Sequence, residues 1–243
     1  MAAMTPGRCV NGLPQPALLL LVPLAVERAA LLGATGGAVV LQTGMGARRA
    51  LAAACRARHV AAGGVAVLGL CGGLRDDLRP GDVVVAATLG VAGDECRHPT
   101  DDPGRLTAAL RAHGLDRVHV GHIVSSPKVV HGAGRARLAR SGALAVDMES
   151  AWLRDAAAGR PFAVVRLVVD TPSTRLLRPG AALRGFVTAE LALRRALPAV
   201  REWAGCPGER RGASGGPGAP PAGGRAGGDG SCATPAHTGP REA

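Results

Sequence analysis

Short apolar runs alternate with segments rich in Ala, Leu and Arg along residues 16–203 of this chain. The runs hold about four to eight Val, Leu, Ile or Ala residues and end at Gly, Pro or a charged residue, which is typical of buried strands. The intervening segments consist of good helix formers. We therefore expect strands at residues 17–24, 38–43, 65–70, 82–88, 118–125, 144–148 and 162–169. We expect helices at residues 26–32, 47–58, 106–112, 135–140, 149–158 and 181–200.

This alternation predicts an α/β fold, a three-layer sandwich with a central mixed sheet. Residues 1–15 are expected to form a loose leader, and residues 204–243, rich in Gly and Pro, a disordered tail. The folded domain is then 16–203. The apolar run at residues 17–24 is too short to span a bilayer, and no clean cleavage site follows it, so we interpret it as a strand.

Composition and charge narrow the classes of function. The chain is 47% hydrophobic with a net charge of +11, but it has only two Phe, two Trp and no Tyr. Its Arg residues are scattered, and four aromatic side chains provide no stacking platform for single-stranded bases, so nucleic-acid binding is not expected. Arg135, Arg137 and Arg140 are interpreted as the solvated face of a helix. The six Cys show no paired spacing, which indicates reduced thiols and a cytoplasmic location.

Three carboxylates follow directly after apolar runs. Glu149 follows the expected strand at 144–148, Asp170 ends the run at 162–169, and Glu27 follows the first strand. Such positions at strand ends are typical of an active site at the edge of a sheet. Each residue alone also has an ordinary structural interpretation. Glu149 would suit a helix N-terminus, Asp170 a turn before proline, and Glu27 a helix surface.

Two glycine-containing turns accompany these acids. Residues 43–46 (Thr-Gly-Met-Gly) join a strand to a helix, where Gly44 and Gly46 would allow close approach of a ligand. Arg48 and Arg49 follow and could pair with phosphate or lie on the helix surface. The second turn holds Cys71 and Gly72 at a strand end, where it would shape a pocket for a flat base or form a plain turn. We expect Cys71 to pack rather than act as a nucleophile.

Taken together and in this order, these stretches resemble the nucleoside phosphorylase/nucleosidase superfamily, which includes purine nucleoside phosphorylase and methylthioadenosine/S-adenosylhomocysteine nucleosidase. The matching stretches cover nearly all of the domain and are residues 24–27, 43–46, 69–74, 80–84, 123–126, 146–149 and 165–170. The sequences of residues 72–82 and 146–150 most resemble those of the hopanoid-associated phosphorylase branch, whose members remove adenine from adenosylhopane.

The resemblance implies a role for each candidate residue. Met148 and Glu149 would hold the ribose, and Asp170 would protonate N7 of the purine as the glycosidic bond breaks. Glu27 matches the residue that activates water in the nucleosidases. The remaining substrate-binding candidates are Gly44 and Gly46 beside the ribose and phosphate, and Cys71, Gly72 and Ser125 at the base. No metal or organic cofactor is implied; inorganic phosphate or water is the co-substrate.

One departure from the family pattern concerns phosphate. The purine phosphorylases carry an Arg and a Ser on the third strand, where this chain has Val67 and Leu70. The remaining candidates for phosphate are Arg48 and Arg49. The leading expectation is phosphorolysis of an adenosine-type nucleoside such as adenosylhopane. The alternatives are hydrolysis of methylthioadenosine-like substrates and a nucleoside-binding protein without turnover. We also expect a homo-oligomer, and a lipid-linked substrate would be compatible with peripheral contact with a membrane.

Overall fold

The computed structural model describes residues 9–10, 13–14, 17–31, 33–172 and 179–205. The chain divides into two units, Met1–Gly208 and Glu209–Ala243. Every described element belongs to the first unit. Most of the expected leader and nearly all of the expected tail lie outside the described residues, so the predictions for both stay open.

The central sheet is mixed, as the sequence predicts, and a small hairpin of β1 (Cys9–Val10) and β2 (Leu13–Pro14) precedes it. The sheet strands are β3 (Leu18–Val22), β4 (Val39–Gln42), β5 (Gly64–Gly73), β6 (Val83–Val91), β7 (His98–Pro99), β8 (Val118–Ser125), β9 (Ala143–Asp147) and β10 (Phe162–Asp170). Strands β4, β3, β5 and β10 are parallel neighbours. The short strands β1, β2 and β7 were not predicted.

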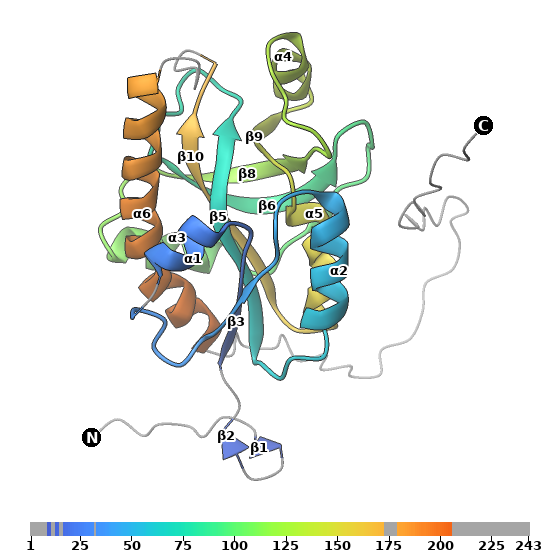
Figure 1. The fold of residues 1–243 in the computed structure, drawn as a ribbon, viewed down its shortest axis with the longest axis vertical. Helices are drawn as coiled ribbons and strands as arrows, with labels where there is room; N and C mark the ends of the chain where they lie inside the picture. Colours follow the sequence, from blue (N-terminus) through green and yellow to red (C-terminus); the bar gives the residue numbers. More distant parts are fainter. Residues whose placement is uncertain (1–8, 11–12, 15–16, 32, 173–178, 206–243) are drawn as a thin grey trace, which may run out of the picture. The chain divides into compact units, whose positions relative to one another are not determined.

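Part of the sheet closes on itself. β10 pairs with β5 on one side and antiparallel with β6 on the other, while β6, β8 and β9 follow as parallel neighbours. The end of β5 then pairs antiparallel with β9, Gly72 opposite Val146, and completes the ring. This closure brings the ends of β5, β9 and β10 together at one end of the ring (Figure 1).

Helices cover both faces of the sheet. They are α1 (Ala25–Ala30), α2 (Ala47–Ala57), α3 (Pro103–Ala112), α4 (Ala133–Arg140), α5 (Ser150–Leu153), the 3-10 helix η1 (Arg154–Ala157) and α6 (Pro179–Gly205). In β3, Leu18 and Leu20 pack towards α3 and α6, whereas Leu19 and Leu21 pack towards α2, because successive strand residues point to opposite faces. Figure 1 shows α6 and α2 on opposite sides of the sheet.

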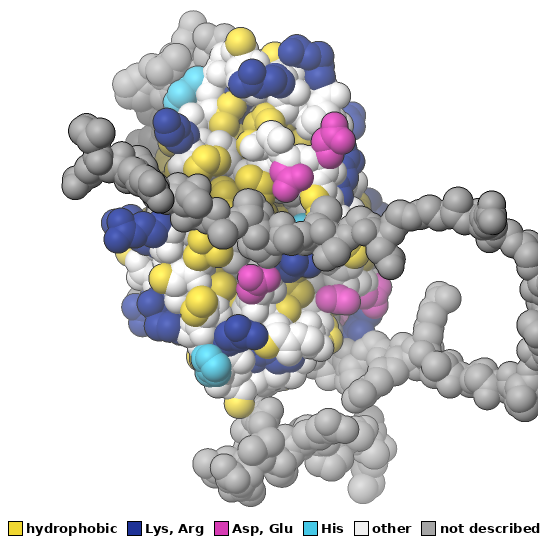
Figure 2. Space-filling view, turned by 90° about the vertical axis from the view of Figure 1, so that its right-hand side faces the viewer, with side chains coloured by type: hydrophobic (Ala, Val, Ile, Leu, Met, Phe, Trp, Pro, Cys, Tyr) yellow, Lys and Arg dark blue, Asp and Glu magenta, His cyan; other side chains and the backbone are white. Residues whose placement is uncertain are grey.

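The basic side chains do not gather in a single patch on the face shown in Figure 2, where Arg and Lys lie scattered among apolar side chains. Among the described residues, no helix is both long and apolar enough to cross a membrane. One expectation about the cysteines is corrected. Cys96 is disulfide-bonded, whereas Cys55 and Cys71 are free thiols.

Candidate active site

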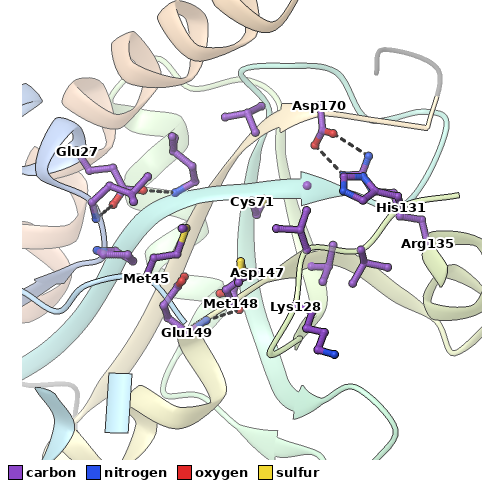
Figure 3. Close-up of a pocket in the computed structure, with 18 of the residues that line it drawn as sticks. Glu27, Met45, Cys71, Lys128, His131, Arg135, Asp147, Met148, Glu149 and Asp170 are labelled. Atoms are coloured by element: carbon purple, nitrogen blue, oxygen red, sulfur yellow. Dashed lines mark hydrogen bonds and ion pairs between the residues drawn. The ribbon is translucent and has the colours of Figure 1, made fainter. Parts of the chain in front are cut away.

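A cavity of roughly 220 Å³ opens where the ends of β5, β9 and β10 meet α1 and the β4–α2 loop. Its wall combines apolar side chains with groups of both charges (Figure 3). The ionisable residues that line it are Glu27, Cys71, Lys128, His131, Arg135, Asp147, Glu149 and Asp170. All three carboxylates selected from the sequence therefore lie in one cavity, although they are 143 positions apart at most.

Glu27 lies in the first turn of α1 and is almost completely buried, with 1% of its surface exposed. Its Oε2 accepts a hydrogen bond from the backbone N–H of Leu24 at 2.7 Å, and its Oε1 accepts one from Leu70 at 2.8 Å. Burial raises the pKa of Glu27 to about 7, against the opposing effect of the Arg166 cation. A carboxyl group tuned in this way can take up or release a proton near neutral pH.

Glu149 follows β9 and also lines the cavity. The backbone N–H of Gly46, at the start of α2, donates to its Oε1 at 3.0 Å. Burial raises the pKa of Glu149 above its ordinary value, while Arg166 acts in the opposite direction. Met45 and Met148 line the cavity beside it. The β4–α2 turn and the end of β9, both selected from the sequence, are thus joined by one hydrogen bond.

Arg166 forms ion pairs with two of the acids, Asp147 and Glu149, and was not predicted from the sequence. It is fully buried in the middle of β10, with its Nε 2.8 Å from Oδ2 of Asp147 and its Nη2 3.5 Å from Oε2 of Glu149. It also donates to the hydroxyl of Ser150. The available signal was a single cation within the Val and Leu residues of 164–169, because a buried charge is retained only where it is paired.

Ser125 takes a different place from the expected one. It ends β8, is fully buried, and its hydroxyl donates to Oδ1 of Asp147 at 2.5 Å while accepting from the N–H of Ala151. It is not among the residues lining the cavity. Its contacts orient Asp147, which in turn contacts Arg166, so Ser125 supports the site from behind.

Asp170 ends β10 at the far end of the cavity from Glu27 (Figure 3). Both of its oxygens accept hydrogen bonds from Arg135, Nη1 to Oδ2 at 2.8 Å and Nη2 to Oδ1 at 2.7 Å. The interpretation of Arg135 as part of a solvated helix face was wrong: its side chain is 11% exposed and points from α4 into the site. The periodicity of a helix shows which residues share a face, but not that a cavity lies beneath that face.

Cys71 and Gly72, at the end of β5, line the cavity as expected. Burial raises the pKa of the Cys71 thiol far above its ordinary value, so the thiol packs and does not supply a thiolate nucleophile. Gly46, at the N-terminus of α2, contacts Glu149, whereas Gly44 has a positive φ of 81° and a side chain there would collide with that of Arg49. Gly44 thus shapes the turn without lining the cavity.

Arg48 and Arg49, the candidates for phosphate, are exposed on α2 and do not line the cavity. The structure therefore does not bring them to the acids. Within the part of the chain that the structure describes, no group of three or more His, Cys, Asp or Glu side chains could hold a metal ion.

Comparisons with known proteins identify the family and support the fold. Residues 26–179 match the sequence profile described as the Phosphorylase superfamily. The fold is similar to 5'-methylthioadenosine/S-adenosylhomocysteine nucleosidase from Neisseria meningitidis in complex with methylthio-immucillin-A, with a TM-score of 0.65, 21% identity and coverage of 76% of this chain and 98% of that one. It is also similar to futalosine hydrolase of Helicobacter pylori, with a TM-score of 0.61, 18% identity and coverage of 75% and 94%.

A third similar structure is the nucleosidase of S. pneumoniae with the transition-state inhibitor MT-ImmA, with a TM-score of 0.61, 19% identity and coverage of 75% of this chain and 99% of that one. No curated protein matches the sequence significantly. The profile spans well over half of the chain, including Glu27, Glu149 and Asp170. The mixed sheet, the acids at its strand ends and this match together show that the chain belongs to the phosphorylase superfamily.

Proposed function

We propose that this protein is an enzyme that cleaves the N-glycosidic bond of a purine nucleoside with water as the acceptor. The observation that carries the proposal is the position of Glu27. It is a buried carboxyl with a pKa of about 7, in the same cavity as Glu149 and Asp170. A base that titrates near neutral pH is suited to remove a proton from water.

In this proposal one end of the cavity binds the ribose and the other end binds the base. Glu149, a hydrogen-bond acceptor, would hold the ribose hydroxyls, while Met148 and Met45 pack against the apolar face of the sugar. As the bond from C1′ to N9 of the purine breaks, C1′ passes through an oxocarbenium-like state. Water then adds to C1′ and gives its proton to Glu27.

Asp170 and Arg135 lie at the end where the base would be. The base departs with the electron pair of the broken bond, so it needs a proton or a cationic hydrogen-bond donor. The sequence-based prediction gives Asp170 the role of protonating N7, and its place in the cavity is consistent with contact with the base. Two structures of similar fold are nucleosidases, one in complex with methylthio-immucillin-A and one with a transition-state inhibitor, which supports a reaction of this class for this chain.

Water is favoured over phosphate because of what the cavity contains. The cations Arg48 and Arg49 are exposed on α2, outside the cavity, whereas Glu27 lies within it. The ionised carboxylate of Glu27 would repel a phosphate dianion placed beside it. Phosphorolysis, adenosylhopane as the substrate, a homo-oligomer, peripheral membrane contact and a cytoplasmic location stay predictions from the sequence.

Product analysis tests the proposal. We would incubate the protein with inosine, guanosine, adenosine and methylthioadenosine, with and without inorganic phosphate, and quantify free base, free ribose sugar and ribose 1-phosphate. The expected products are base and free sugar, at a rate independent of phosphate. Glu27→Gln should lower that rate by at least about 100-fold, the usual effect of losing a general base.

The matched control is Glu202→Gln, which changes an exposed carboxylate paired with His113 on the outside of the molecule. It should leave the rate unchanged. Formation of ribose 1-phosphate would show phosphorolysis instead, and release of base from none of the nucleosides would overturn the proposal.

A further inference from the structure

At the end of the cavity where the base would bind, Asp170 is paired with Arg135. Arg135 and Asp170 form two hydrogen bonds of 2.7 and 2.8 Å, and their side chains are 11% and 12% exposed. Both line the cavity. A base that reaches this end meets a guanidinium together with the carboxylate.

Gly72 provides the space in which this pair lies. A Cβ atom built on Gly72 would overlap Nη2 of Arg135 and lie 3.1 Å from Oδ1 of Asp170. The absence of a side chain at this position of β5 therefore allows the guanidinium to rest against the strand at the cavity wall. Because the overlapping atom is the end of a flexible side chain, an Ala at this position would displace the guanidinium without removing either charge.

The guanidinium has unused donors at this place. Its two hydrogen bonds to Asp170 engage the two terminal nitrogens, and Nε–H is buried without a hydrogen-bond partner among the described residues. In a guanidinium, Nε–H and the outer N–H of one terminal nitrogen are parallel and form a two-pronged edge. A buried donor without an acceptor is unfavourable by about 1–3 kcal/mol, and an acceptor supplied by a bound base would remove this cost.

We propose that Arg135 is the residue that selects the base, and that the cavity takes a 6-oxopurine such as hypoxanthine or guanine; this inference rests on the proposed function. O6 and N7 of a 6-oxopurine are adjacent acceptors that match the two-pronged edge of an arginine. A 6-aminopurine presents an N–H donor in place of O6, directed at the donors of Arg135. This proposal differs from the sequence-based expectation of adenine, which stays a prediction.

The same contact would assist bond cleavage. When C1′–N9 breaks, the electron pair passes to the purine and spreads to N7 and O6, where the Arg135 cation stabilises it. Water supplies the hydroxyl group to C1′ and its proton to Glu27, and solvent returns a proton to the base. In this scheme Asp170 holds the guanidinium by both terminal nitrogens and is a positioning residue, in place of the proton donor to N7 that the sequence predicts.

The test compares kcat/KM for inosine and guanosine with kcat/KM for adenosine. The wild type should favour the 6-oxopurine nucleosides by at least about 10-fold, the range of one good bidentate contact. Arg135→Gln removes the guanidinium, and Gly72→Ala displaces it. Each variant should bring the ratio of kcat/KM for the 6-oxopurine nucleosides to kcat/KM for adenosine close to one. Arg137→Gln, on an exposed residue of the same helix, should keep the wild-type ratio. A wild-type preference for adenosine, or a ratio unchanged in both Arg135→Gln and Gly72→Ala, would overturn the proposal.

Binding of the free bases separates this inference from the proposed function. Calorimetric titration of the wild type should give a lower Kd for hypoxanthine than for adenine, and Arg135→Gln should remove the difference, while thermal melting confirms that each variant is folded. If no nucleoside is cleaved but hypoxanthine is still selected through Arg135, the proposed function fails and the recognition role stands. If nucleosides are cleaved and neither kinetics nor binding distinguishes the bases, the inference alone fails.

Discussion

The carboxyl group of Glu27 sets an expected pH dependence of the reaction. Its pKa is about 7 because burial disfavours the ionised form, and only the ionised form can accept a proton from water. We expect kcat/KM to fall about 10-fold for each pH unit below 7 and to level off above it. Initial rates from pH 5 to 9 measure this. An acid limb centred near pH 4.5 would contradict the assignment of Glu27 as the base.

The same residue makes an independent prediction about stability. The folded protein keeps the Glu27 proton up to about pH 7, whereas the unfolded chain releases it near the ordinary value of 4.5. The folded state therefore binds more protons between these values, and the free energy of unfolding contributed by Glu27 falls as the pH rises from about 4.5 to about 7.

Glu27→Gln has no carboxyl group to titrate, so the variant does not lose this part of the free energy of unfolding as the pH rises. The stability of the variant relative to the wild type should thus increase between pH 5 and pH 8, by up to about 3 kcal/mol. Glu149, whose pKa is also raised, is present in both proteins and largely cancels in the comparison. Thermal melting of the two proteins at both pH values gives the answer, and a constant difference between them would contradict the predicted titration.

At the scale of the element, β10 combines a structural charge with a site residue. Arg166 lies in its middle with no exposed surface and faces Asp147 and Glu149. Replacing Arg166 with Met keeps much of the volume but leaves two buried acids without their cation. We expect the free energy of unfolding to fall by about 3–5 kcal/mol, the usual effect of breaking a buried pair.

Urea denaturation measures this change, and the exposed pair Arg75–Asp77 provides the control. Both of its side chains are more than half exposed, so Arg75→Ala should change the free energy of unfolding by less than about 1 kcal/mol. A double variant, Arg166→Met with Asp147→Asn, should recover part of the loss because one buried charge is removed. No recovery would show that packing, and not the charge, accounts for the effect.

The sequence predicts the individual elements well where local pattern determines them. β8 is found at Val118–Ser125 as expected, because its apolar residues and flanking turns are local signals. β5 continues to Gly73, beyond the expected end at residue 70. Its last residues are in a strand because they pair with β9, more than 70 positions later, and such a pairing leaves no local pattern.

The same distinction applies to the site. Glu27, Glu149 and Asp170 were predictable because each acid interrupts an apolar pattern at a strand end. Arg135 was not, because its exposure depends on where α4 packs beside β9, and the matching space at Gly72 is seen only once α4 and β5 are both placed. Ser125 was placed in the site but supports Asp147 from behind, since a strand's last residue can point to either face.

At the scale of the whole molecule, the sheet and the cavity belong entirely to the unit Met1–Gly208. The end of α6 is part of its core: Leu197, Val200 and Trp203 are all at most 4% exposed and pack against the sheet. The folded unit should therefore need α6 to its end, whereas the buried residues of the core and the lining of the cavity, as far as the structure describes them, all lie before residue 209.

Two truncations test this division. A chain ending at Gly208 should melt within about 1 °C of the full chain, less than the shift of about 2–4 °C expected for 1 kcal/mol, and keep its kcat/KM. A chain ending at Arg195 loses Leu197, Val200 and Trp203, each contributing on the order of 1.5–3 kcal/mol of buried apolar surface, and should not fold cooperatively. A clearly lower melting temperature of the 1–208 chain would show that residues 209–243 stabilise the fold, and lost activity with unchanged melting would show that they contribute to the site.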